Sequence, residues 1–104
     1  MSALHFVGRL GRHFRLGNML AKQMVQSRLK SEEGLSFTEF TYQIFQAYDW
    51  LHLYDEYNCC IQVGGHDQMG NIKAGFDLIN RVKKKHVYGN YPSLFVQLGC
   101  LQFK

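Results

Sequence analysis

Three polar side chains lie on one stripe of a long apolar segment. In LSFTEFTYQIFQAYDWLHLYDEY, residues 35–57, Tyr42, Gln46 and Asp49 stand at i, i+4 and i+7, which is one face of a helix. Polar groups on a buried helix face need hydrogen-bond partners. The three side chains either satisfy each other and neighbouring loops or line a binding site, and the spacing alone leaves both interpretations open.

A second polar stretch, QVGGHDQMGN at residues 62–71, continues the apolar run CCIQV. The junction between a strand and a helix often holds ligands, because helix N-terminal N–H groups converge there and glycine exposes the backbone. Gly64, Gly65 and Asp67 therefore predict a ligand loop, with Asp67 placed to grip a ligand hydroxyl. An ordinary glycine turn is the alternative interpretation.

A long helix must position the first polar stripe. Ser36 and Glu39 have the spacing of a capping box, and Leu35 and Phe40 that of a hydrophobic staple, so the helix is predicted to begin at about Phe37. Its apolar residues cover more than half of the circumference, which predicts a mostly buried helix. These apolar residues are Phe37, Phe40, Tyr42, Ile44, Phe45, Tyr48, Leu51 and Tyr54.

A strand and a second helix must position the glycine loop. Asn58 is predicted to end the first helix in a left-handed conformation, and CCIQV is predicted to form a buried strand. The second helix is expected from about Asp67 to Lys85, with Ile72, Phe76, Ile79 and Val82 facing the core. VYGNYPSLFV predicts another short strand with Pro92 near its start or edge. This order predicts an α/β fold, half of a doubly wound layout.

Charge is distributed in blocks along the chain. Residues 1–31 contain six Lys or Arg and no acid, whereas residues 32–72 contain seven acids and no Lys or Arg. The net charge of +4 and the basic flanks fit a protein that touches RNA phosphates, although a solvated face is the commoner reason for the triplet Lys83–Lys85. The acid-free opening imitates a mitochondrial presequence, but NMLAKQMVQSRL continues on helical spacing, with Asn18 as its predicted N-cap, and favours a folded segment.

The 104 residues predict a single globular domain or a part of one. The longest apolar run is far shorter than the roughly 20 residues that span a bilayer, so no membrane segment is expected. Cys59, Cys60 and Cys100 suit neither a disulfide framework nor a zinc spacing, and are expected to be reduced and buried.

Taken together, two of these segments carry a family resemblance. LSFTEFTYQIFQAYDWLHLY and QVGGHDQMGNIKAGFDLI resemble the patterns SFTEFxYxxLQAYDFLxL and QxGGSDQWGNIxxGxxLI of bacterial and mitochondrial tyrosyl-tRNA synthetases. The resemblance covers roughly residues 8–88. It implies that residues 1–104 are part of a class I, Rossmann-like, doubly wound catalytic domain, helix-rich with a few parallel strands and with a divergent tail from about residue 89 to 104. The implied activity is that of a tyrosine–tRNA ligase, which activates tyrosine with ATP and transfers it to tRNA-Tyr.

The resemblance also implies which residues hold tyrosine. Tyr42 and Gln46 match the positions that bind the ammonium of the amino acid, and Asp49 matches the position that receives the phenolic hydroxyl. Gln62 matches the lip of the same pocket. The stripe on the long helix would then be one wall of a tyrosine pocket.

The glycine loop matches the adenylate side of the family's site. Gly64 and Asp67 match positions near the adenylate ribose, and Gly65 belongs with them to the expected adenylate site. Gln68 matches a position near the carboxyl group being activated, which makes it the candidate catalytic residue. ATP is expected as a substrate, accompanied by Mg²⁺, with no metal held by the protein itself.

Macromolecular contacts follow from the same resemblance. Lys22 and Arg28, together with the cluster Lys83–Lys85, are expected to face the tRNA acceptor stem, and Phe37 matches a position in the interface of a homodimer. The mitochondrial matrix is the expected compartment, or the cytoplasm if the chain is bacterial.

The sequence departs from the family's pattern in several places. His66 and Met69 replace the usual Ser and Trp of GGSDQWGN, and His66 is interpreted as a variant loop residue. Neither the H-x-G-H motif nor a KMSKS-like loop occurs in the 104 residues, so the chain alone is expected to be inactive. The alternative hypothesis is a catalytically inactive truncated isoform that acts as a dimerisation or RNA-binding module.

Overall fold

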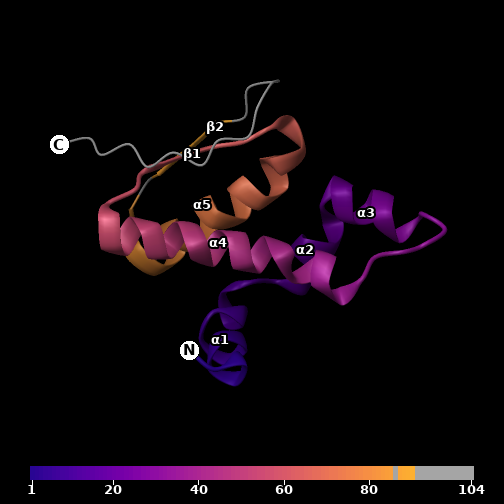
Figure 1. Cartoon of the computed structure of the whole chain (residues 1–104), viewed down its shortest axis with the longest axis horizontal. Helices are drawn as coiled ribbons and strands as arrows, with labels where there is room; N and C mark the ends of the chain where they lie inside the picture. Colours follow the sequence, from indigo (N-terminus) through magenta and orange to yellow (C-terminus); the bar gives the residue numbers. More distant parts are fainter. Residues whose placement is uncertain (86, 91–104) are drawn as a thin grey trace.

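Helix α4 (Phe37–Tyr57) and helix α5 (Met69–Lys83) pack against each other at the centre of the fold (Figure 1). The computed structural model describes residues 1–85 and 87–90. Ahead of α4 come the short helices α1 (Ala3–Arg9), η1 (Gly11–His13), α2 (Leu16–Ala21) and α3 (Gln23–Leu29). After α4 follow strand β1 (Ile61–Val63), the 3₁₀ turn η2 (His66–Gln68), α5 and strand β2 (Tyr88–Asn90).

The ends of α4 agree with the sequence prediction. The Ser36 hydroxyl accepts a hydrogen bond from the Glu39 N–H at 3.1 Å, and Asn58 ends the helix with φ at 53°. The prediction of the second capping-box bond, from the Ser36 N–H to the Glu39 carboxylate, is wrong. The Glu39 carboxylate turns instead to the guanidinium of Arg28, which donates to both of its oxygens at 3.0 Å, because a charged bidentate pair is stronger than a bond to one backbone N–H.

Strands β1 and β2 form a parallel pair joined by α5, as expected for an α/β unit. Ile61 lies opposite Tyr88, and Val63 lies opposite Asn90. The first strand is shorter than CCIQV, because Cys59 and Cys60 lie ahead of it. Pro92 and the rest of the predicted second strand, like most of the predicted divergent tail, lie outside the described residues.

The core is concentrated where α4 crosses α5. Trp50 is 2 % exposed, and its indole Nε1 donates to the carbonyl of Cys59 at 3.1 Å. A Cβ on Gly75 would lie 2.6 Å from Trp50 Cε3 and 3.6 Å from the Cα of Ala47. Gly75 therefore lets the two helices approach closely. The buried hydrophobic core consists of Leu10, Ala47, Trp50, Leu51, Ile72, Ala74, Leu78, Ile79 and Val87.

Two burial predictions are wrong. Helix α4 is not mostly buried, since Phe37, Tyr42 and Phe45 are 80 %, 58 % and 48 % exposed. Helix α5 meets α4 at Ala47 and Trp50, and the three exposed aromatic residues lie outside the buried core. In α5 the core-facing side is shifted, because Val82 is 37 % exposed while Leu78 is buried.

The N-terminal segment contacts both central helices, α4 and α5. The ring of Phe6 stacks on Phe45 with a centroid distance of 5.1 Å and meets the edge of Tyr48 at 5.5 Å. Arg81 of α5 donates from Nη1 to the carbonyl of His13 at 2.6 Å. Asn18 is not an N-cap as predicted but lies inside α2, whose N-cap position is held by Arg15 without a side-chain hydrogen bond.

Cys59 is buried, with its Sγ 3.6 Å from the carbonyl oxygen of Ile61, and Cys60 is half-buried, whereas Cys100 lies outside the described residues. Within residues 1–85 and 87–90, no helix is long and apolar enough to cross a membrane. The same part of the chain holds no group of three or more His, Cys, Asp or Glu side chains placed to bind a metal ion.

Substitution of Gly75 tests the close helix crossing. Gly75→Ala is expected to lower the free energy of unfolding by about 1–3 kcal/mol, because the added methyl overlaps the fully packed Trp50 ring. Gly17→Ala is the matched control. A Cβ at Gly17, inside α2, meets nothing within 4 Å, so this change should stabilise the chain by up to about 1 kcal/mol. Urea denaturation of both variants provides the measurement, and equal stabilisation by both would contradict the packing.

Candidate active site

Four amide side chains and one carboxylate form a row of hydrogen bonds between α4, β1 and the start of α5. This row, called the amide chain below, consists of Gln62, Gln46, Asn71, Gln68 and Asp67. Gln46 Nε2 donates to Gln62 Oε1 at 2.9 Å, and Asn71 Nδ2 donates to Gln46 Oε1 at 3.0 Å. Asn71 Nδ2 also approaches Gln68 Oε1 at 3.4 Å, and Gln68 Nε2 lies 3.3 Å from Asp67 Oδ2. The crossing of the two central helices thus brings these five side chains, which are up to 25 residues apart in the sequence, to one place.

The amide chain contains four of the predicted site residues. Gln46 and Gln62 were expected beside tyrosine, and Asp67 and Gln68 beside the adenylate. Gln62 is only 3 % exposed, so its amide is held away from solvent. Hydrogen bonding to neighbours satisfies these polar groups and also fixes where they point.

Tyr42 and Asp49 lie on the same helix but outside the amide chain. Tyr42 is 58 % exposed and Asp49 is exposed, one helical turn on either side of Gln46. Their place agrees with the predicted stripe. The described residues do not enclose the stripe into a pocket, so the two side chains stand at an open surface of α4.

The glycine loop differs from the prediction in the place of Gly64 and Asp67. Gly64 is buried, and a Cβ there would lie 3.0 Å from both Gln68 Cβ and Ile72 Cδ1. Its lack of a side chain thus allows β1 to meet the start of α5. Asp67 is exposed and sits in η2, ahead of α5, because the helix begins at Met69 and ends at Lys84 in a left-handed conformation. The helix predicted for 67–85 is therefore shorter at both ends.

Asn71 is a site residue that sequence reasoning missed. It is the only residue that joins the two halves of the described amide chain, since its Nδ2 reaches both Gln46 and Gln68. A signal for it was present in the sequence. Asn71 stands three residues after Gln68, on the same side of the helix start, and closes the polar run QVGGHDQMGN.

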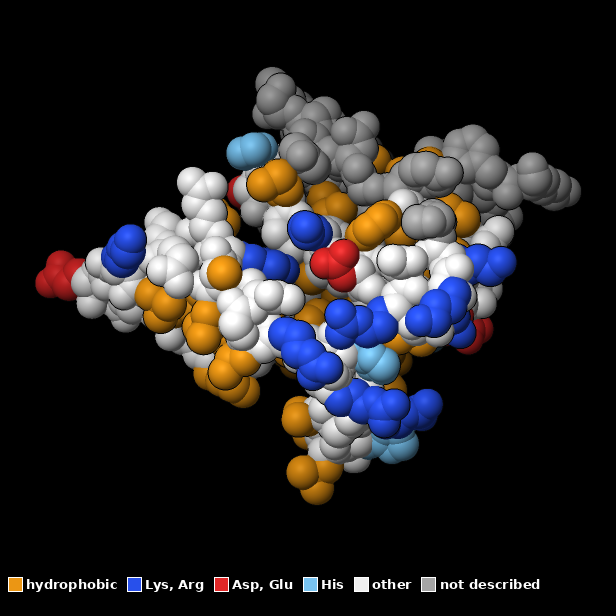
Figure 2. All heavy atoms as spheres, turned by 180° about the vertical axis from the view of Figure 1, so that it is seen from behind, with side chains coloured by type: hydrophobic (Ala, Val, Ile, Leu, Met, Phe, Trp, Pro, Cys, Tyr) orange, Lys and Arg blue, Asp and Glu red, His pale blue; other side chains and the backbone are white. Residues whose placement is uncertain are grey.

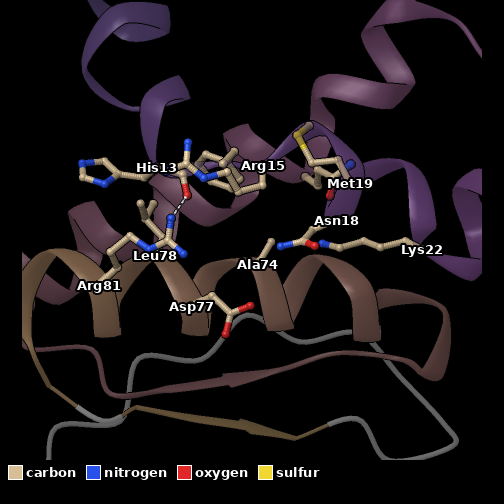
Figure 3. Close-up of a pocket in the computed structure, with 11 residues that line it drawn as sticks. His13, Arg15, Asn18, Met19, Lys22, Ala74, Asp77, Leu78 and Arg81 are labelled. Carbon is tan, nitrogen blue, oxygen red and sulfur yellow. Dashed lines mark hydrogen bonds between the residues drawn. The ribbon is translucent and has the colours of Figure 1, made fainter.

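A basic pocket of about 60 Å³ lies on another side of α5, between this helix and the segment that leads into α2 (Figure 3). Lys22 donates from Nζ to the carbonyl of Gly70 at 2.8 Å. Burial lowers the pKa of Lys22, and Asp77 opposes that shift. The charged and polar lining residues are His13, Arg15, Asn18, Lys22, Gln43, Asp77 and Arg81.

The basic residues predicted to face RNA differ in their exposure and in their hydrogen-bond and ion-pair partners. Figure 2 shows Lys and Arg side chains gathered on the face opposite to the view of Figure 1. Lys22 is half-buried in the basic pocket, whereas Arg28 is bound through both guanidinium contacts to Glu39, which raises the pKa of Arg28. Lys83 pairs with Asp55 at 2.7 Å. The Lys83–Lys85 cluster is exposed at the end of α5, as a solvated face would be.

Comparison with known proteins identifies the family. Residues 1–102 match the family model described as tRNA synthetases class I (W and Y). The chain belongs to this family. The match confirms the resemblance carried by the two motifs, and with it the fold class of a partial Rossmann-like catalytic domain.

Several similar proteins are tyrosine–tRNA ligases. The chain is 60 % identical over 90 residues to the mitochondrial enzyme of Drosophila melanogaster, covering 86 % of this chain and 19 % of the relative. It is 49 % identical over 103 residues to the enzyme of Acidothermus cellulolyticus, covering 99 % of this chain and 24 % of the relative. A truncated mitochondrial tyrosyl-tRNA synthetase of Aspergillus nidulans shares the fold with a TM-score of 0.78 and 32 % identity over 92 % of this chain and 31 % of that structure.

The chain thus spans about a fifth to a quarter of the length of these curated relatives. The part of the fold that is matched includes α4, β1, η2 and α5, which carry the amide chain.

Proposed function

We propose that this chain supplies the tyrosine pocket and the ribose side of the adenylate site of a tyrosine–tRNA ligase. The hydrogen-bonded chain from Gln62 through Gln46, Asn71 and Gln68 to Asp67 is the observation that carries the proposal, because it joins the residues proposed for both ligands. The names of the relatives support the same activity.

Each proposed ligand group has a partner of suitable chemistry. The Tyr42 phenol and the Gln46 carbonyl would accept from the ammonium of tyrosine, and Asp49 would accept from its phenolic hydroxyl. Gln68 would orient the tyrosine carboxylate, which attacks the α-phosphorus of ATP and expels pyrophosphate. Mg²⁺ is proposed to accompany ATP, and Asp67 with the backbone at Gly64 and Gly65 would hold the ribose side.

Larger partners complete the proposal. The activated tyrosine would pass to tRNA-Tyr, whose acceptor stem would lie along the basic face around Lys22. Phe37, which is 80 % exposed at the start of α4, would lie in the interface of a homodimer, where an exposed aromatic residue can bury a large area. The Drosophila and Aspergillus proteins are mitochondrial, which supports the mitochondrial matrix as the compartment.

Tyrosine-dependent exchange of pyrophosphate into ATP tests the activity. A chimeric ligase would carry the 90 matching residues of this chain in place of the corresponding segment of the Drosophila enzyme. We expect its exchange rate to lie within about tenfold of the parent enzyme, a barrier difference of roughly 1.4 kcal/mol. A folded chimera without exchange would contradict the proposal and favour the non-catalytic module.

Asp49 is expected to set the choice of tyrosine over phenylalanine. Tyrosyl-tRNA synthetases are known to discriminate between these substrates by about 10⁵-fold, because phenylalanine leaves a buried polar group of the site unpaired. In the chimeric ligase, Asp49→Ala should lower the ratio of the two kcat/KM values by about 10- to 100-fold, the effect of one lost bond to a charged group.

Competitive aminoacylation with both amino acids measures that ratio. Asp55→Ala is the matched control on the same helix, because the carboxylate of Asp55 is paired with Lys83 away from the stripe. A ratio that changes equally in both variants would remove Asp49 from the pocket.

Lys22 is expected to contact tRNA phosphate, and Arg28 to contribute less because Glu39 holds its guanidinium. In the chimeric ligase, Lys22→Ala should reduce the slope of log affinity against log salt by about one unit, as for one phosphate contact. Arg28→Ala should change the slope by a smaller amount. Affinity for tRNA-Tyr between about 50 and 200 mM salt is the measurement, and an unaltered slope in Lys22→Ala would exclude it from the RNA interface.

A further inference from the structure

The amide chain has one end that can only accept hydrogen bonds. Asp67 supplies a carboxylate, so the nearby Gln68 amide must direct its NH₂ group toward Asp67 and its carbonyl away from it. The Gln68 carbonyl then faces Asn71, which lies 3.4 Å away through Nδ2. Asn71 must therefore turn its NH₂ group, and not its carbonyl, into the site.

The orientation of Asn71 decides the orientation of the next two amides. The second hydrogen of Asn71 Nδ2 is donated to Gln46 Oε1 at 3.0 Å, which leaves the Gln46 NH₂ group to donate to Gln62 at 2.9 Å. A reversed Gln46 amide would bring two NH₂ groups together at Asn71 and two carbonyl oxygens together at Gln62. Both arrangements are repulsive at these distances, and Gln62 is buried, so water cannot relieve them.

We propose that Asn71 is a positioning residue that fixes the amide of Gln46 and links it, through Gln68 and Asp67, to the adenylate loop. This inference rests on the function proposed above, in which the Gln46 carbonyl accepts from the ammonium of tyrosine. With one lone pair taken by Asn71, the same oxygen keeps a second lone pair for the substrate. Asn71 itself touches neither ligand in this assignment.

The substitution Asn71→Asp separates positioning from charge. The new carboxylate has nearly the same shape but cannot donate to Gln46 or Gln68, so the Gln46 amide is expected to reverse and present NH₂ where the substrate ammonium should bind. In the chimeric ligase we expect the KM for tyrosine to rise by about tenfold, as for one lost bond to a charged group. A negative charge acting simply on the ammonium would lower that KM.

Asn80→Asp is the matched control, because Asn80 is an exposed amide on the same helix and lies outside the amide chain. Its KM for tyrosine should equal that of the unsubstituted chimera. Lowering the pH provides a second test. Protonation of the carboxyl at residue 71 in Asn71→Asp restores an O–H donor, so its deficit in tyrosine binding should shrink as the pH falls toward the range in which a carboxyl takes up a proton.

Nuclear magnetic resonance of the 104-residue chain tests the orientation without any enzyme activity. The side-chain NH₂ signals of Gln46, Gln62 and Gln68 are expected to shift in Asn71→Asp and to stay in place in Asn80→Asp. Unmoved NH₂ signals, or a KM for tyrosine that is unchanged or lowered in Asn71→Asp, would overturn the role of Asn71. Failure of the unsubstituted chimera to exchange pyrophosphate would instead contradict the proposed function, while the NH₂ signals would still decide the orientation.

Discussion

The contact of Gly75 with the ring of Trp50 is the constraint on which the rest of the structure depends. No residue with a Cβ fits at position 75 without moving Trp50, so the contact sets how closely α4 and α5 approach. Gln46 precedes Ala47, which lies at this crossing, and Asn71 stands one helical turn before Gly75. The close approach therefore places Gln46 and Asn71 within hydrogen-bond distance of each other. A packing feature in the core thus determines the geometry of the candidate site.

Neutral amides suit the ligands proposed for this site. Tyrosine would bring an ammonium and a carboxylate, and ATP would bring phosphates, so a fixed charge that favoured one group would oppose another. Gln46, Gln62, Gln68 and Asn71 can offer carbonyl oxygens or NH₂ groups as their orientation requires. Asp67 is the only carboxylate of the amide chain and lies at its exposed end. Because a carboxylate only accepts hydrogen bonds, Asp67 sets the direction in which every amide of the row donates.

Sequence patterns predicted where the helices and strands lie in the chain better than they predicted which side chains are buried. Ser36 and Asn58 act on their own backbone neighbours, so both ends of α4 could be read from local chemistry. The exposure of Phe45 and Val82 could not, because it depends on which side of each helix meets its neighbour. The same limit applies to Glu39, whose spacing from Ser36 indicated a capping box while its carboxylate pairs with the distant Arg28. Asn71 belongs to the polar run that the sequence marks as a ligand loop, but its bond to Gln46 depends on how α4 crosses α5 and cannot be predicted from the spacing.

Binding of a non-hydrolysable tyrosyl-adenylate analogue to this chain tests most directly whether the amide chain is the ligand site. Titration of the isotope-labelled protein at millimolar ligand should shift the side-chain NH₂ signals of Gln46, Gln62, Gln68 and Asn71 together, with one apparent affinity. The phenylalanyl analogue should bind more weakly, because it lacks the hydroxyl for Asp49. Shifts confined to the basic pocket around Lys22 and Arg81, with the four amide signals unmoved, would contradict the assignment of tyrosine and adenylate to this site.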